Sequence, residues 1–321
     1  MRRMMITLFF VVYCSTVLHA QQKDFEGSIA YHVNFTSKVE GVSALAWKNL
    51  MFSGDSLIMV FKGANAVGTT GSITYYYRPD KQKLYMKIKG IDTLFYLDYH
   101  SDTTTVKSIT KNADQKKVAG YNCKSITMVT GMHTMKYFYA PDLYRNPDYD
   151  KDYKIGGGDV LSREIASIWL EGFERFNYFD IQQTCYRVQP SAVNDNIFIL
   201  PDLPEKVFSM SSIKKEAQFP GKENGWIRYI QTNLKGELAA KYVKIPKGET
   251  TALQTVVVDF MISDQGLPVN IIVLNKDEVH SKLAAEAVRV IAESPVWKPA
   301  TVLGGKTIFH GTQSITFQAT K

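Results

Sequence analysis

Alternation of apolar and polar positions is the clearest pattern in the first two thirds of the chain. Many short segments there are rich in Tyr, Phe, Ile, Val and Thr, and several alternate with a period of two, as half-buried antiparallel strands do. Turn signals such as Arg78-Pro79-Asp80 and Ala119-Gly120 separate the segments. The pattern predicts strands over Gly27–Thr36, Leu57–Lys62, Ile73–Arg78, Lys83–Lys89, Asp92–Asp98, Lys124–Val129 and Met135–Ala140.

One window in this region has helical spacing instead. Over Val160–Phe176, apolar residues recur at intervals typical of a helix face: Leu161, Ile165, Ile168, Trp169 and Phe173. The sequence therefore predicts a single helix against an antiparallel sheet, because each element must bury its apolar face on the other.

The C-terminal third predicts, in order, a helix, a β-hairpin, a second helix and a final strand. The first helix carries Trp226, Ile227, Ile230 and Leu234 on one face and is expected to end at Gly236. The other elements are expected at Thr255–Ile262, Leu267–Asn275, Ser281–Glu293 and Lys306–Gln318.

These patterns predict an α+β protein with two domains. Residues 21–210 are expected to form an antiparallel β half-barrel-like domain with one helix, and residues 216–321 a small α-β-β-α-β domain. The chain has 321 residues, of which 45% are hydrophobic, and this is enough material for two cores.

The start of the chain predicts export. Residues 1–20 read as a signal peptide, because Arg2-Arg3 precede the uncharged apolar segment Met4–Leu18 and the small residue Ala20 precedes Gln21. A retained membrane anchor is the alternative, but about 15 apolar residues fall short of the roughly 20 that a spanning helix needs. We therefore expect cleavage and a periplasmic location, with association at the outer membrane.

Charge and motifs exclude several functional classes. The formal net charge is +7, but Lys and Arg are scattered, so the footprint of a nucleic-acid-binding protein is missing. The sequence contains neither H-E-x-x-H nor G-x-S-x-G, and we expect no enzymatic activity and no cofactor.

We also expect no metal site. Asp148, Asp150, Asp152 and Asp159 have spacing reminiscent of a calcium loop, but Tyr153 replaces the required glycine, so an exposed acidic loop is expected.

Two cysteines remain after removal of the signal peptide, Cys123 and Cys185. In an oxidising periplasm they are candidates for a disulfide, which would close a long loop and stabilise the first domain. The alternative is a pair of small buried apolar side chains.

Aromatic residues in the first domain leave two interpretations open. Tyr75, Tyr77, Tyr85, Phe95 and Tyr137 could line a site for an apolar ligand on a curved sheet. The alternative is a filled core, because any packed sheet requires such residues.

Short motifs in residues 21–210 resemble those of GLPGLI-type secreted bacterial domains of unknown function. They are Lys117–Lys124, Tyr137–Asp142 and Ile197–Pro201. The six-residue signature that names that family is missing. The resemblance implies a fold similar in outline to the half-barrel of lipoprotein carriers, and it implies no activity.

Residues 216–321 resemble the TonB C-terminal domain family. The motifs that carry the resemblance occur in the family's order: Phe219-Pro220-Gly221, the hairpin Val256–Val273, Ala285–Arg289, Ser294–Ala300 and Ile315-Thr316-Phe317. Two features depart from the family's pattern. Ser314 stands where the family usually has proline, and Lys241–Glu249 replaces its tyrosine-proline segment.

The TonB resemblance implies a periplasmic interaction protein that binds a partner by β-strand addition, in connection with TonB-dependent transport. The implied partner is an envelope protein such as an outer-membrane TonB-dependent receptor. An alternative is a lipid- or peptide-binding carrier or scaffold with a purely structural C-terminal domain. The final strand would be the docking edge, or it would merely complete the sheet. Its candidate partner-binding residues are Ile308, Phe309, His310, Gly311, Thr312, Gln313 and Ile315.

Overall fold

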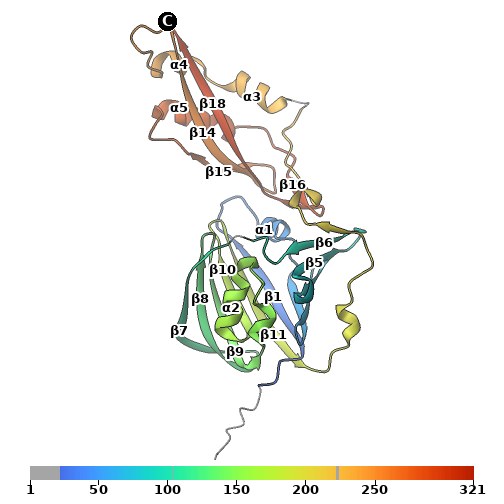
Figure 1. The fold of residues 1–321 in the computed structure, drawn as a ribbon. Helices are drawn as coiled ribbons and strands as arrows, with labels where there is room; N and C mark the ends of the chain where they lie inside the picture. The colour runs from blue at the N-terminus through green and yellow to red at the C-terminus, as the bar shows by residue number, and fades with distance from the viewer. Residues whose placement is uncertain (1–21, 103, 222–223) are drawn as a thin grey trace, which may run out of the picture.

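The protein is described here by a computed structural model that covers residues 22–102, 104–221 and 224–321. The predicted signal peptide, residues 1–20, lies outside these described residues. Figure 1 shows two β-sheet regions stacked end to end, the N-terminal part (residues 22–207) and the C-terminal part (residues 214–321). The fold is mostly β with one large open sheet, which is consistent with the α+β class. Within the described ranges, every helix is too short or too polar to cross a membrane.

Twelve strands of the N-terminal part form one sheet in the order β12-β6-β5-β4-β3-β2-β1-β11-β10-β9-β8-β7. Strands β1 to β6 pair as one antiparallel meander and β7 to β11 as a second, and the pairing of β1 with β11 joins them. Only β12 runs parallel to its described neighbour, β6. The strands are β1 (Gly27–Ser37), β2 (Ser56–Lys62), β3 (Asn65–Thr70), β4 (Ile73–Arg78), β5 (Lys83–Ile88), β6 (Leu94–Asp98), β7 (Val106–Val118), β8 (Tyr121–Thr130), β9 (Thr134–Tyr144), β10 (Ser167–Arg175), β11 (Phe179–Pro190) and β12 (Glu205–Val207).

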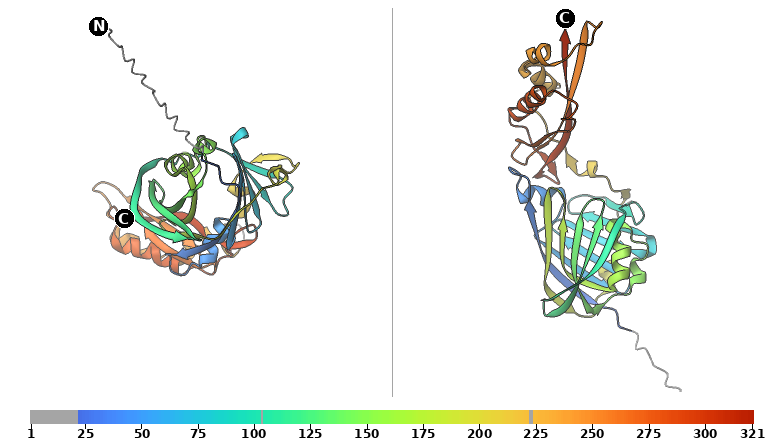
Figure 2. Two further views of the ribbon diagram at one scale, coloured as in Figure 1. Left: turned by 90° about the horizontal axis from the view of Figure 1, so that it is seen from below. Right: turned by 90° about the vertical axis from the view of Figure 1, so that its left-hand side faces the viewer.

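The large sheet curls around helix α2 (Gly158–Ile165), as the end-on view in Figure 2 shows. Leu161 and Ile165 of α2 pack on alternate residues of β8 and β9. Strand β8 presents even-numbered positions to the helix and β9 odd-numbered ones, and the remaining positions lie on the opposite face of the sheet. The residues facing α2 are Ile126, Met128, Met135, Tyr137 and Tyr139. Short 3-10 helices lie at Pro79–Lys81 (η1), Pro147–Asp150 (η2), Ile155–Gly157 (η3), Asp195–Phe198 (η4) and Met210–Ser212 (η5).

The helix predicted over Val160–Phe176 is wrong in its second half. Helix α2 ends at Ile165, where Ala166 takes a left-handed conformation with φ 43°, and β10 begins at Ser167. Strand β10 lies between β9 and β11 and pairs with both. Pairing with two neighbours satisfies the backbone of this segment and outweighs its local helical spacing, because propensity is a weak prior against tertiary context.

The C-terminal part contains a three-stranded antiparallel sheet in the order β15-β14-β18. Helices cover one face of it and bury a core that includes Ile230, Ala239, Val258, Leu283 and Phe317. A second small sheet has the order β13-β16-β17. The elements are β13 (Lys214–Lys215), α3 (Gly225–Asn233), α4 (Glu237–Tyr242), β14 (Thr251–Ile262), β15 (Pro268–Val273), α5 (Ser281–Ala292), β16 (Ala300–Val302), β17 (Gly305–Thr307) and β18 (Phe309–Thr320).

The expected hairpin is present between β14 and β15, and its turn requires a glycine. Gly266 has φ 82°, and a Cβ placed there would lie 2.1 Å from the carbonyl oxygen of Trp297. The Trp297 amide in turn donates to the Gly266 carbonyl at 2.9 Å. This contact holds the hairpin turn against the chain that follows α5.

The two parts of the molecule meet at helix α1 (Ala44–Leu50), which the sequence pattern did not predict. The Ser43 hydroxyl donates to Asp264 Oδ2 at 2.7 Å. The Thr307 hydroxyl donates to the Ala46 carbonyl at 2.9 Å. Both bonds span more than two hundred positions of sequence, and Trp47 is buried beside them in a cluster that contains residues of both parts. Helix α1 therefore attaches the large sheet to the C-terminal part.

Candidate functional site

Strand β18 forms one edge of the three-stranded sheet. All twelve of its residues are in register with β14, from Phe309 opposite Ile262 to Thr320 opposite Thr251. In the described part of the chain, its other side pairs with no strand. Its outer backbone amides and carbonyls are therefore the groups that an added strand would use.

Six of the seven candidate residues lie in β18: Phe309, His310, Gly311, Thr312, Gln313 and Ile315. Ile308 is placed elsewhere. The strand expected over Lys306–Gln318 is split at this residue, because β17 ends at Thr307 in the other small sheet. The Ile308 side chain is 6% exposed and packs in the cluster that joins the two parts, so it is a junction residue and no part of the edge.

One face of β18 points into the helix layer. Ile315 is buried there, and the indole nitrogen of Trp226 in α3 donates to Gln313 Oε1 at 2.7 Å. The Phe309 ring lies over Gly311, since a Cβ at that glycine would come within 2.6 Å of the ring. The Trp226 bond joins β18 to α3, and helix α4 also contacts this strand, so β18 is held against the helix layer.

The other face of β18 is exposed and polar. His310 Nε2 lies 2.8 Å from Asp259 Oδ2, and the Thr312 hydroxyl donates to Asp259 Oδ1 at 3.2 Å. Further along, the hydroxyls of Thr255 and Thr316 lie 2.9 Å apart. Asp259, which is 9% exposed, thus links the edge strand to the central strand β14.

The sequence analysis did not identify two residues that contribute to this site, Asp259 and Trp226. Asp259 interrupts an apolar strand, and this was the available signal that it has a specific polar partner. Trp226 appears in the sequence only as part of an apolar helix face. The bond from its indole to Gln313 joins positions 87 residues apart, and a local pattern does not reveal such a pair.

The edge strand also lacks the features that normally block strand addition. Strand β18 reads FHGTQSITFQAT and contains no Lys, Arg, Asp, Glu or Pro. The opposite edge, β15, is half as long and starts at Pro268, and its register shifts near Asn270, which has φ 48°. Among the edges of this sheet, β18 is therefore the one suited to a partner strand.

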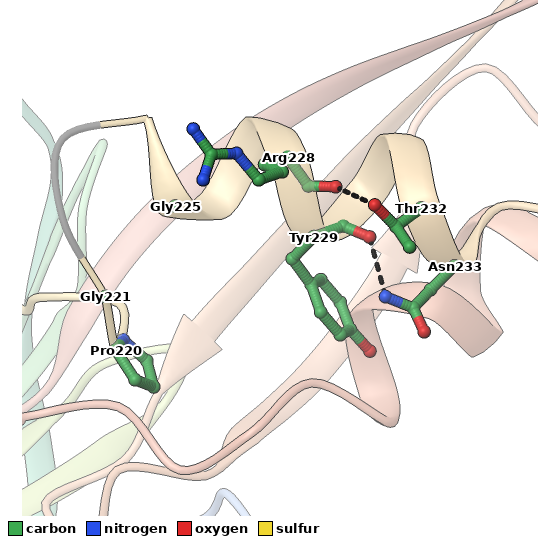
Figure 3. Close-up of a pocket in the computed structure, with 7 residues that line it drawn as sticks. All are labelled: Pro220, Gly221, Gly225, Arg228, Tyr229, Thr232 and Asn233. Atoms are coloured by element: carbon green, nitrogen blue, oxygen red, sulfur yellow. Dashed lines mark hydrogen bonds between the residues drawn. The ribbon is translucent and has the colours of Figure 1, made fainter.

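A cavity of about 340 Å³ lies beside α3, next to this sheet (Figure 3). The hydroxyl of Thr232 donates to the Arg228 carbonyl and the Asn233 amide donates to the Tyr229 carbonyl, at 2.9 and 2.8 Å. These polar groups are thus engaged within their own helix. The lining residues are Pro220, Gly221, Gly225, Arg228, Tyr229, Thr232 and Asn233.

The two cysteines are free thiols in the structure, so no disulfide joins Cys123 to Cys185. Cys123 lies on β8 and Cys185 on β11, with β9 and β10 between these strands in the sheet. Both side chains are buried in the same apolar cluster. Burial is the largest cause that raises the pKa of each thiol, to about 11 for Cys185, which keeps that side chain neutral. They serve as small core residues.

The acidic loop does not converge on a cation. Asp159 pairs with Lys154 at 2.5 Å, and Asp150 accepts from the Ser162 hydroxyl at 2.8 Å. In the part of the chain that the structure describes, no group of three or more His, Cys, Asp or Glu side chains could hold a metal ion.

The aromatic residues proposed to line a ligand site are spread over separate packed clusters. Tyr75 and Phe95 belong to one, Tyr77 to a second and Tyr137 to a third. The fifth, Tyr85, is 1% exposed and its hydroxyl contacts both Glu205 oxygens at 3.2 Å. This distribution favours a filled core.

Comparison with known proteins identifies no family. No family model matches the sequence, and no curated protein matches it. The chain is similar to a structure of PNGF-II in the P21 space group, with 10% identity over 74% of this chain and 44% of that chain and a TM-score of 0.35. It is also similar to LprF from Mycobacterium bovis, with 8% identity over 52% of this chain and 89% of that chain and a TM-score of 0.22. The chain spans under half the length of PNGF-II, and likenesses this weak do not bear on its function.

Proposed function

We propose that this chain is an exported cell-envelope protein whose C-terminal part binds a partner protein by β-strand addition at β18. The observation that carries the proposal is a long, uncharged edge strand that pairs, among the described residues, on one side only. Backbone groups along such an edge give affinity to an extended partner segment, and side chains beside it give selectivity. The partner strand would extend the sheet β15-β14-β18 by one position.

The order of elements supports the TonB-like interpretation of this part. Helix α3, the hairpin β14–β15, helix α5 and strand β18 follow one another as the resemblance implies, with α4 as an addition. The partner class we propose is an extended segment of an outer-membrane TonB-dependent receptor. The periplasmic location belongs to the same proposal and rests on the basic and apolar pattern of residues 1–20.

Site-specific photo-crosslinking in the native host tests the proposal. Ser314 is the best position for the probe, because it is exposed in the middle of β18, whereas His310 is engaged by Asp259. The matched control is a probe at Lys117, exposed on β7 at the edge of the large sheet. We expect a specific envelope-protein adduct from Ser314 and none from Lys117, identified by mass spectrometry. Equal adducts from both positions, or none from Ser314, would contradict strand addition at β18.

A further inference from the structure

A second surface feature lies on the large sheet, far from β18 in sequence and on the face opposite α2. It is a groove of about 440 Å³, within the size range of small-molecule sites. Strand register brings its residues together: Phe173 lies opposite Lys136, which lies opposite Thr127, and Arg175 lies opposite Thr134. The lining residues are Lys116, Thr127, Thr134, Lys136, Phe138, Phe173 and Arg175.

The carboxylates near this groove already have partners. Glu171 pairs with Lys116 and also accepts from Gln182 and Thr184, at 3.2 and 3.3 Å. Asp114 pairs with Lys136 at 2.7 Å. These two ion pairs are neutral and contribute no net charge to the groove.

Arg175 differs from the two lysines. It is exposed at the end of β10 and, among the described residues, it has no ion-pair partner. The nearest carboxylate in register is Asp180, which is held by Lys38 at 2.5 Å. The groove therefore has one cation in excess, and a planar guanidinium matches the geometry of an oxyanion.

The floor of the groove is aromatic. Lys116 Nζ lies 4.3 Å from the centre of the Phe138 ring and 5.5 Å from that of Phe173, and Lys136 Nζ lies 5.2 Å from that of Phe138. The ammonium groups thus sit over the Phe138 ring, which is itself only 7% exposed. The apolar wall open to a ligand is the half-buried Phe173, beside this positive charge. A small inorganic anion would use the charge alone and leave the aromatic surface in water.

We propose that this groove binds a small organic anion with an apolar or aromatic body, its acidic group on Arg175 and its body on Phe173. Arg175 would donate two hydrogen bonds to the acidic group, and the Phe173 ring would cover the body. Thr127 and Thr134 offer hydroxyls along the wall for polar atoms of the ligand. This site is separate from β18 and does not depend on strand addition.

Calorimetric titration of the full chain tests the site with a matched pair of probes, 2-naphthalenesulfonate and neutral 2-naphthalenemethanol. We expect saturable binding of the sulfonate and weaker binding of the alcohol. Arg175→Met removes the charge but keeps side-chain length, and it should weaken sulfonate binding by about tenfold while leaving alcohol binding unchanged, since the lost contact is charge-assisted. Arg228→Met is the control, because Arg228 is an exposed arginine at the other cavity.

Phe173→Leu tests the aromatic contact separately from the charged contact made by Arg175. It keeps apolar volume but removes the ring face, so both probes should bind several-fold more weakly, as expected for a lost aromatic contact. Equal sulfonate affinity in wild type and Arg175→Met, or an equal loss in Arg228→Met, would overturn the proposal. So would sulfonate binding that fails to saturate.

Discussion

The long edge strands of the two parts, β7 and β18, are nearly equal in length but opposite in character. Strand β7 contains Lys107, Lys111, Lys116 and Lys117, and its pairing with β8 shifts register twice. Strand β18 is uncharged and keeps one register with β14 over its whole length. Lysines and bulges are the means by which proteins prevent unwanted pairing at a sheet edge. Edge β7 is therefore protected and edge β18 is open, and this difference locates the proposed docking site.

Adding charge to the open edge should have the largest effect. The double change Ser314→Lys and Gln318→Lys alters two exposed positions of β18, and lysine on an edge strand opposes strand addition. We expect the affinity for the partner recovered by crosslinking to fall at least about tenfold, as for loss of a few backbone hydrogen bonds. Binding to immobilised full-length protein measures this. The control on the other edge is Lys107→Gln with Lys117→Gln on β7, which should leave the affinity unchanged. An equal loss of affinity in the β18 variant and the β7 variant would refute the distinction between the two edges.

An ion pair in helix α5, in the layer that covers the β18 sheet, and an ion pair made by β7 should also differ in strength. The Glu286 side chain is 4% exposed and accepts from Arg289 Nη2 at 2.6 Å and from the Lys235 amide at 2.8 Å. Glu286→Gln should lower the free energy of unfolding of the C-terminal part by about 2 kcal/mol, because charged hydrogen bonds are lost in a buried site. By contrast, Glu164 and Lys111, 3.3 Å apart near β7, are more exposed. Glu164→Gln should cost less than about 0.5 kcal/mol in urea unfolding.

The Glu286 contribution should depend on pH in one direction. Hydrogen bonds from Arg289 are the largest cause that lowers the pKa of Glu286 in the folded protein. Its stabilising effect is then complete above the pKa of the unfolded carboxyl and is lost as the pH falls through the lower folded value. The difference between wild type and Glu286→Gln should therefore shrink in acid. A difference that grows in acid would contradict this assignment.

The polar link across β18 should have a smaller effect. Asp259→Ala removes the acceptor shared by His310 and Thr312, and we expect about 1 kcal/mol less stability and weaker partner binding. Asp114→Ala in β7 is the matched change, and it should leave the unfolding midpoint and partner binding unaltered because its carboxylate is exposed. Unaltered stability and binding in Asp259→Ala would show that Asp259 does not support the edge.

Removing charge from β7 should have the smallest effect. In Lys107→Thr with Lys117→Thr, the two register shifts remain and continue to bend the strand away from a flat edge. We expect the association state of the full chain, measured by light scattering after size exclusion, to stay that of the wild type. Association of the variant into dimers would mean that Lys107 and Lys117, and not the register shifts, protect β7.

The sequence predicted the strands best where alternation and turn residues agreed. Strand β4 was expected at Ile73–Arg78 and has these bounds, and helix α5 differs from its prediction by one residue. Prediction failed where tertiary pairing decided the outcome. The segment after Ala166 has helical spacing but becomes β10, since strands on both sides pair with it.

The candidate site could be predicted only in part, for a similar reason. The position of His310 to Ile315 in a strand followed from the pattern, but the free side of that strand depends on the order of the whole sheet. Ile308 fits the alternation of the final strand, yet it packs with Trp47 from the other part of the molecule. Helix α1, which brings Trp47 there, is too short to give a clear periodic signal.

Amide hydrogen exchange along β18 tests strand addition most directly. The full chain would be measured alone and with the partner segment recovered by crosslinking at Ser314, and β7 would serve as the internal reference. Strand addition predicts that amides of Phe309–Thr320 on the unpaired side become slow to exchange when the partner is bound, while those of β7 do not change. Binding that leaves exchange in β18 unaltered, or that protects β7 instead, would contradict the proposed docking edge.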